Sequence, residues 1–187
     1  MPFIKTEIPD LLVYEPRVFN DARGYFYESY NLNTFSAEGV THAFVQDNQA
    51  QSCFGVIRGL HFQKEPHAQT KLVRALFGTI RDVVVDLRKG SPTYGKSFSI
   101  DLSAENKKQL LVPKGFAHGY AVLSPTAEVM YKCDDFYNKE SEGGLLFNDP
   151  ALQIEWGIPA DKAIVADKDL YHPTLAQCDP HFIYRKS

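Results

Sequence analysis

Apolar and polar residues alternate over many short runs of this chain, and helical spacing is scarce. The run FSIDLS at 98–103 alternates strictly, which predicts a strand with one buried face. Further strands are expected at 110–112, 120–123 and 127–132, with turn clusters of proline, glycine and serine between them. Many short strands separated by turns indicate an all-β fold, a jelly-roll barrel with a few short helices.

Local patterns predict several further elements. Apolar runs at 72–77 and 80–87 flank a glycine-threonine turn, which favours a hairpin. Residues 31–38 favour a short helix, with Asn31 or Asn33 as its cap and Gly39 as its stop. The aromatic run YFYESY at 25–30 follows a turn-forming segment and is expected to be a strand. Glycine and proline clusters predict a less regular C-terminal tail, with a last strand at 181–184.

Length, composition and charge restrict the class of protein. The 187 residues fit a single domain, and 44% apolar and 23% charged residues are ordinary values for a globular protein. A net charge of -3 gives no electrostatic footprint for nucleic acid. The N-terminus lacks a basic lead before a long apolar run, and no window is apolar enough to span a membrane, so a cytoplasmic protein without a membrane partner is expected. Three cysteines without a CxxC pair fit reduced thiols.

The segment GVIRGLHFQKEPHAQTK at 55–71 places Arg58, His61 and Lys71 in a run that otherwise reads as a buried strand. Each polar group inside such a run costs free energy unless it finds a partner or a ligand. An imidazole near two fixed cations therefore indicates an anion-binding site that contains a base. The competing interpretation of His61 is a core histidine satisfied by a backbone carbonyl.

The segment PKGFAHGYAVLS at 113–124 is similar to the second motif of the cupin superfamily of small jelly-roll barrels. In metal-binding cupins, a His-x-His pair and a glutamate in the first motif join this later histidine as ligands. Here the first motif contains His61, and Gln63 stands in place of the second imidazole. Because amides bind first-row metals poorly, no metal site of this kind is expected. His61 and His118 are then free to act as acid, base or hydrogen-bond partner.

Five segments in order resemble one family within this superfamily, the dTDP-4-dehydrorhamnose 3,5-epimerases. They are GVIRGLHFQ with the lysine that follows it, IRDVVVDLRKGSPTYGK, PKGFAHGYAVLS, MYKCDDFYNKESEGG and IEWGIPADKAIVADKD. The resemblance covers Phe19 to Asp169. It implies a homodimeric isomerase of dTDP-L-rhamnose synthesis that inverts two carbons of a nucleotide-linked 4-keto sugar. The ketone acidifies the neighbouring C–H bonds, so the resemblance implies neither a metal nor another cofactor.

The resemblance also implies catalytic roles. His61 is the expected base and Tyr131 the expected proton donor on the far side. Asp169 would hold the tautomer of His61, and Lys71 would stabilise an enolate as its charge develops. Without the resemblance, Tyr131 reads equally well as a core tyrosine, and Asp169 as part of a solvated loop.

The nucleotide requires cations for its phosphates and accessible rings beside its base. The positions that match substrate contacts of the family, besides Lys71, are Arg23, Phe26, Glu28, Gln46, Asp47, Asn48, Arg58, His118, Tyr137, Glu142 and Lys168. The strands within residues 1–30 are expected to contribute to the dimer, where 23–28 would complete the site of a neighbouring subunit.

Asp82 lies in an apolar strand and needs a partner, so we expect it either to orient His118 or to form a structural ion pair elsewhere. Departures from the family pattern stand at Ala50, Glu65, Gly157 and Ala166. These leave open whether both carbons are inverted. The alternatives are a 3- or 5-epimerase of another dTDP-deoxysugar pathway, a non-catalytic cupin that binds a nucleotide sugar, and a metal-dependent cupin oxygenase.

Overall fold

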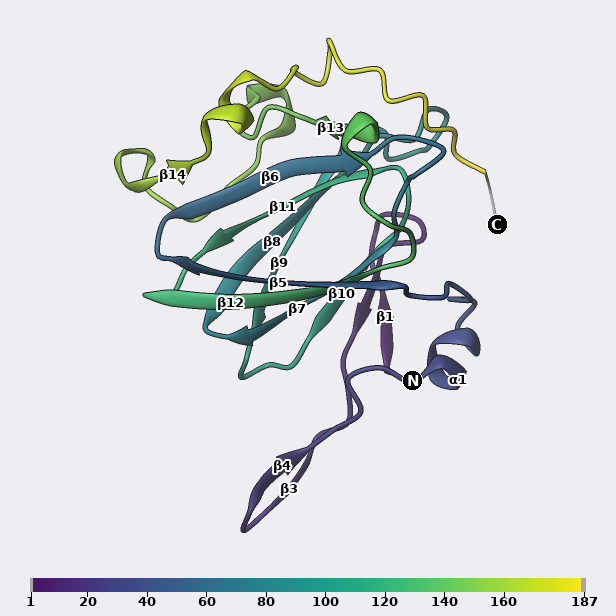
Figure 1. Cartoon of the computed structure of the whole chain (residues 1–187), viewed down its shortest axis with the longest axis vertical. Coiled ribbons are helices and arrows are strands. Elements are labelled where there is room, and N and C mark those ends of the chain that lie inside the picture. Colours follow the sequence, from purple (N-terminus) through teal and green to yellow (C-terminus); the bar gives the residue numbers. More distant parts are fainter. Residues whose placement is uncertain (1, 186–187) are drawn as a thin grey trace.

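The computed structural model describes residues 2–185, in which two six-stranded sheets face each other (Figure 1). The first sheet, in the order β1-β2-β10-β7-β12-β5, consists of β1 (Phe3–Lys5), β2 (Leu12–Tyr14), β5 (Gln46–Cys53), β7 (Lys71–Phe77), β10 (Gln109–Val112) and β12 (Thr126–Cys133). The second, in the order β13-β6-β11-β8-β9 with β14 beside β6, consists of β6 (Val56–Gln63), β8 (Thr79–Asp86), β9 (Ser97–Ser103), β11 (Phe116–Val122), β13 (Glu142–Gly144) and β14 (Ile164–Val165). The expected all-β jelly roll is confirmed.

Helices are few and short. They are α1 (Leu32–Ser36) and the 3-10 helices η1 (Lys139–Ser141), η2 (Pro150–Leu152), η3 (Ala160–Lys162) and η4 (Asp167–Tyr171). The predicted asparagine cap of α1 is Asn31, whose side chain accepts hydrogen bonds from the backbone N–H groups of Asn33 and Thr34. Within residues 2–185, no helix has the length and apolar character needed to cross a membrane.

The second sheet is buried on both of its faces. On β8, Val84 belongs to the core between the two sheets, whereas Val83 and Val85 pack on the outer face. That outer face is covered by the C-terminal tail, including Leu145 and Trp156 (Figure 1). Burial on both faces explains why the VVV run of β8 lacks the polar alternation of a half-exposed strand.

The expected hairpin of 72–77 with 80–87 is wrong, although both strands exist. β7 pairs with β10 and β12 of the first sheet, and β8 pairs with β9 and β11 of the second. Gly78 carries the chain from one sheet to the other. It has a φ of +71°, and an added Cβ would lie 2.2 Å from the carbonyl oxygen of Thr126. The glycine turn therefore serves a crossing between layers, because each strand already has two other neighbours.

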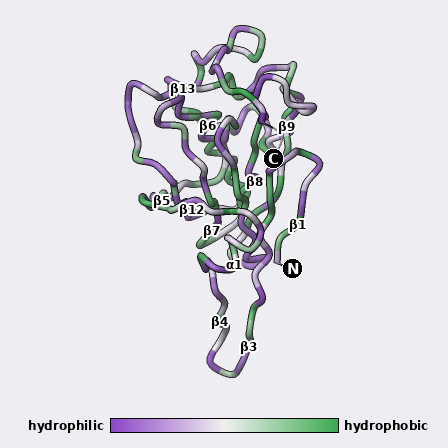
Figure 2. The backbone as a smooth tube through the Cα atoms, turned by 90° about the vertical axis from the view of Figure 1, so that its right-hand side faces the viewer, coloured by the Kyte–Doolittle hydropathy of each residue, from purple (hydrophilic) through white to green (hydrophobic). Residues whose placement is uncertain are grey.

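Two other strand predictions are only partly right. The strand predicted at 25–30 ends at Phe26, because the strand it pairs with begins at Phe19. Strands β3 (Phe19–Asp21) and β4 (Gly24–Phe26) form a two-stranded hairpin whose last pair is Phe19 with Phe26. This hairpin projects away from the two sheets (Figures 1 and 2). The predicted strand 181–184 is reduced to an isolated bridge between Lys89 and Ile183.

Candidate active site

A β-bulge on β6 brings two expected site residues to the same side of the second sheet. Arg58 and His61 are three positions apart, so regular alternation would place them on opposite faces. The pairing of β6 with β11 shifts by one residue between the pairs His61–His118 and Arg58–Tyr120. The extra residue on β6 lets both side chains border one cavity.

Glycines on both strands permit this irregular pairing. Gly59 has a φ of +128°, and a Cβ added there would lie 2.5 Å from the Cα atom of Gly119 on β11. A side chain at Gly59 would therefore push the two backbones apart and displace His61.

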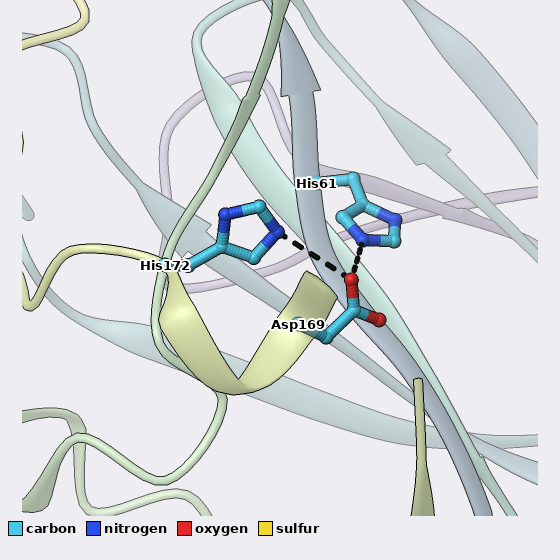
Figure 3. Close-up of side chains that lie close together, drawn as sticks. All are labelled: His61, Asp169 and His172. Carbon is cyan, nitrogen blue, oxygen red and sulfur yellow. Dashed lines mark hydrogen bonds and ion pairs between the residues drawn. The ribbon is translucent and has the colours of Figure 1, made fainter. Parts of the chain in front are cut away.

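His61 forms a hydrogen-bonded pair with Asp169 of η4 (Figure 3). The His61 Nε2 atom lies 2.7 Å from Asp169 Oδ1, and the backbone N–H of Gly59 donates to Asp169 Oδ2 at 3.3 Å. The carboxylate is 2% exposed, whereas the His61 side chain is 27% exposed. The carboxylate is thus held inside the protein, while the imidazole remains accessible.

Asp169 is ionised and fixes the ring tautomer of His61. Burial alone would raise the pKa of the Asp169 carboxyl, but the hydrogen bonds from His61 and Gly59 outweigh burial and lower that pKa. An ionised carboxylate can only accept, so Nε2 of His61 carries the proton and Nδ1 keeps a free lone pair. The carboxylate also favours the imidazolium that forms once His61 has taken up a proton.

Tyr131 and Lys71 reach the site from the first sheet. Tyr131 lies on β12, Lys71 begins β7, and the Lys71 Nζ atom is 5.7 Å from the centre of the Tyr131 ring. Burial raises the pKa of Tyr131 to about 12, so its phenol keeps its proton. Burial also lowers the pKa of Lys71, because the attraction of its ammonium to Cys133 and Asp82 is too weak to offset the cost of burial.

These side chains border two cavities of about 320 and 210 Å³. Both cavities are lined by His61, Lys71, Tyr131 and Lys168. The imidazole of the second sheet and the phenol of the first sheet therefore meet at the same space. A base and an acid placed this way can remove a proton from one face of a carbon and return a proton to the other face.

Six further predicted contacts border these cavities. Gln46, Asn48, Tyr137 and Glu142 line the larger cavity, and Arg58 and His118 line the smaller one. Glu142 accepts hydrogen bonds from Lys168 at 2.6 Å and from the Tyr137 hydroxyl at 3.0 Å. The bond from Lys168 lowers the pKa of Glu142, which is thus an anion next to the cation.

Four predicted substrate contacts lie outside both cavities. Side chains alternate between the two faces of β5, so Asp47 points to the face opposite to that of Gln46 and Asn48. There it pairs with Lys132 at 3.0 Å. Arg23 and Phe26 lie on the projecting hairpin, where Phe26 is 67% exposed. Glu28 follows the hairpin and borders a separate surface cavity. In the described part of this single chain, the hairpin residues do not meet His61.

Asp82 forms the pair with His118 that was expected as one of two possibilities. The His118 Nε2 atom lies 2.6 Å from Asp82 Oδ1, and both side chains are buried. Asp82 and His118 belong to the adjacent strands β8 and β11. The pair fixes one wall of the smaller cavity.

Sequence reasoning missed His172, a third group beside the pair of His61 and Asp169. Its Nε2 atom lies 3.4 Å from Asp169 Oδ1, and burial lowers its pKa. The sequence shows a histidine three residues after Asp169, but it does not show that the 3-10 helix η4 brings the two side chains together. From the sequence, Gln63 is only the residue that replaces a metal-binding histidine. It borders the larger cavity and accepts a hydrogen bond from the backbone N–H of Asn138.

In this jelly roll, the cavities place an imidazole–carboxylate pair opposite a phenol and an ammonium group. This fold and this site define a cupin-type acid–base enzyme. Comparison with known proteins agrees: a family model described as dTDP-4-dehydrorhamnose 3,5-epimerase matches residues 5–177. The chain belongs to this family of isomerases.

The similarity extends over nearly the whole chain. A dTDP-4-dehydrorhamnose 3,5-epimerase of Shigella flexneri is 53% identical over 180 residues, which cover 96% of this chain and 98% of that protein. A solved epimerase structure from Legionella pneumophila, in complex with dTDP-4-keto-L-rhamnose, is 42% identical with a TM-score of 0.94 and covers 98% of each chain. A Bacillus anthracis structure with TDP and PPi bound is 50% identical with a TM-score of 0.89, covering 92% of this chain and 98% of that one.

Proposed function

We propose that this protein inverts C3 and C5 of dTDP-4-dehydro-6-deoxy-D-glucose, giving dTDP-4-dehydro-L-rhamnose for dTDP-L-rhamnose synthesis. One observation supports the reaction type above all others. His61 of the second sheet and Tyr131 of the first sheet border the same two cavities. Family membership supports the choice of substrate.

His61 starts the reaction through Nδ1. The 4-keto group acidifies the hydrogens on C3 and C5, and removal of either one leaves an enolate. Asp169 accepts a hydrogen bond from the Nε2–H group of His61, so the lone pair needed for abstraction is on the other ring nitrogen. No redox step or bound metal is required, because the ketone itself stabilises the carbanion.

Lys71 and Tyr131 complete the cycle. Burial disfavours the ammonium of Lys71, and its attraction to Cys133 and Asp82 does not offset that cost. An enolate oxygen would add a negative charge beside this cation, so their interaction strengthens as the reaction proceeds. Tyr131 then delivers its proton to the opposite face of the carbon. With a pKa of about 12, the resulting phenolate readily takes up a proton again before the second carbon reacts.

Arg58 and Lys168 bind the diphosphate, since they are the cations at the smaller cavity besides Lys71 among the described residues. The protein is a homodimer in this proposal. The hairpin of β3 and β4 extends from each subunit and brings Arg23 and Phe26 to the nucleotide of its neighbour. Its exposed aromatic surface and its distance from the sheets support that role. The cytoplasmic location stays a prediction.

Solvent deuterium tests the function. After incubation with the keto sugar in deuterated water, the proposal predicts deuterium at both C3 and C5, as read by NMR or mass spectrometry. Label at one carbon alone would identify a single-site epimerase of another deoxysugar pathway. Absence of label together with tight binding of dTDP would identify a non-catalytic binding protein.

A further inference from the structure

Three potential metal ligands converge beside the second sheet. Figure 3 shows a nitrogen of His61 and a nitrogen of His172 directed at the same oxygen of Asp169. The distances to Asp169 Oδ1 are 2.7 Å from His61 Nε2 and 3.4 Å from His172 Nε2, and all three atoms lie within 4.8 Å of one another.

His172 has no role in the proposed reaction. Its Nε2 atom is buried, and among residues 2–185 its polar contact is the ion pair with Asp169 Oδ1 at 3.4 Å. The ring packs directly on the backbone of β13, where a Cβ added to Gly144 would lie 2.3 Å from Nε2. The glycine thus holds the ring against the carboxylate. A separation of 3.4 Å is long for a hydrogen bond, so a metal ion bound by both groups would satisfy this buried nitrogen better.

We infer that His61, Asp169 and His172 form a Zn²⁺ site that blocks catalysis when it is occupied. Two imidazoles and a carboxylate are a common three-ligand set for Zn²⁺, with water as the fourth ligand. Bond lengths of about 2.0–2.2 Å place tetrahedral donors roughly 3.3 Å apart. The separation of 3.4 Å between His172 Nε2 and Asp169 Oδ1 matches this value, whereas the 2.7 Å between His61 Nε2 and Asp169 Oδ1 is a hydrogen-bond distance, so the partly exposed ring of His61 must move back to admit the metal. The site differs from the cupin metal site, which Gln63 interrupts.

Occupation of this site removes the base, a consequence that rests on the proposed role of His61. Zn²⁺ binds the lone pair of Nε2, so the ring proton must move from Nε2 to Nδ1, and the imidazole stays neutral. Nδ1 then has no lone pair with which to accept a proton from carbon. Asp169 is neutralised by the same metal and no longer supports an imidazolium.

His172 borders a third cavity of about 490 Å³, and it lines neither of the two cavities around Tyr131. Three cations, Lys64, Lys139 and Lys168, and two anions, Glu142 and Asp179, also border the third cavity. The attraction for Zn²⁺ therefore comes from the ligands themselves, above all the Asp169 carboxylate, and not from the charge of this cavity. Cys178 borders it too and is the competing soft ligand.

Metal titration tests the site independently of the reaction. Co²⁺ absorption and Zn²⁺ calorimetry on the intact protein should show one site per chain. His172→Gln and His172→Phe, which keep the side-chain bulk, should weaken that binding by roughly 10–100-fold or more. Cys178→Ser and His67→Ala should leave it unchanged. Equal affinity in wild type and both His172 variants would overturn the inference.

Turnover measurements test the consequence. Saturating Zn²⁺ should lower kcat by about 10²–10⁴-fold, as expected for loss of a general base, and a chelator should restore it. Binding of dTDP should be retained. The His172 variants should resist Zn²⁺. If Zn²⁺ binds through His172 but turnover continues, the metal site stands and the assignment of His61 as base fails.

Discussion

At the scale of single residues, the proposed role of His61 as a base depends on which ring nitrogen carries the proton. Asp169 determines this, because an ionised carboxylate accepts a hydrogen bond from Nε2–H and leaves the lone pair of Nδ1 free. Removing the negative charge while keeping the shape of the side chain would therefore disable the base without removing it.

Asp169→Asn tests this dependence. The amide can donate to Nε2, which would move the ring proton to Nδ1, so we expect kcat to fall by about 10²–10⁴-fold with little change in dTDP affinity. Steady-state kinetics and calorimetry measure the two effects. Asp167→Asn, an exposed change in the same 3-10 helix, is the matched control and should keep full activity. Near-normal turnover of Asp169→Asn would show that tautomer control is unimportant.

The catalytic roles are predictions of the family resemblance, which rests on residue types in a specific order along the chain. In this way the sequence predicted that four residues share one site, and all four border the smaller cavity. It did not predict His172, whose importance comes only from its distance to Asp169. It also placed Asp47 among the substrate contacts. A residue-by-residue match does not show to which face of β5 that side chain turns.

At the scale of elements, the segment after β8 is held by one buried carboxylate. Asp86 accepts hydrogen bonds from Arg88 Nε at 2.9 Å, from the Ser91 hydroxyl at 2.6 Å and from the Thr93 hydroxyl at 2.8 Å. Arg88 in turn donates to Asp10, which ties this turn to the N-terminal segment. Burial raises the pKa of Asp86, but these hydrogen bonds lower it further than burial raises it.

Asp86→Asn should lower the free energy of unfolding by roughly 2–4 kcal/mol at neutral pH, since it removes a buried ion pair and leaves Arg88 with fewer acceptors. A lowered pKa in the folded state stabilises the fold above the unfolded-state pKa of about 3.9, and this contribution is lost as the pH falls through the folded-state pKa. Urea unfolding at neutral and acidic pH should therefore show a difference that shrinks with acid. Asp101→Asn, at an exposed pair, is the control. A difference that stays constant with pH would contradict the assignment.

The strands were predictable because alternation reflects burial of one face, and this held for β9 and β12. Which strands pair was less predictable. A glycine turn between two apolar runs indicates a hairpin, yet Gly78 connects two different sheets. The bulge on β6 was also not predicted. Arg58 and His61 lie three positions apart and so break the alternation of β6, but only the pairing with β11 shows that a bulge brings them to one side.

At the scale of the whole molecule, the projecting hairpin is the feature that a single chain does not explain. Arg23 and Phe26 expose most of their side chains, and the cavities around His61 receive no residue from the hairpin. In the proposed dimer, each hairpin completes the site of the other subunit.

Subunit mixing tests this arrangement. Arg23→Ala with Phe26→Ala would damage the neighbour's site, and His61→Asn would damage its own. Each variant alone should be nearly inactive. After mixing and exchange of subunits, about a quarter of all sites should combine an intact base with an intact hairpin, and activity should recover to that level. No recovery, despite mixed dimers confirmed by mass spectrometry, would show that the hairpin serves its own subunit or none.

Hydrogen exchange in two variants separates the roles of the facing rings. In deuterated water, Tyr131→Phe keeps the base, so exchange at C3 and C5 should continue while the inverted product falls by about 10²–10⁴-fold. His61→Asn lacks the base, so both exchange and inversion should be lost while dTDP still binds. Wild-type exchange by His61→Asn, or full inversion by Tyr131→Phe, would contradict a base and an acid acting from opposite sheets on one sugar.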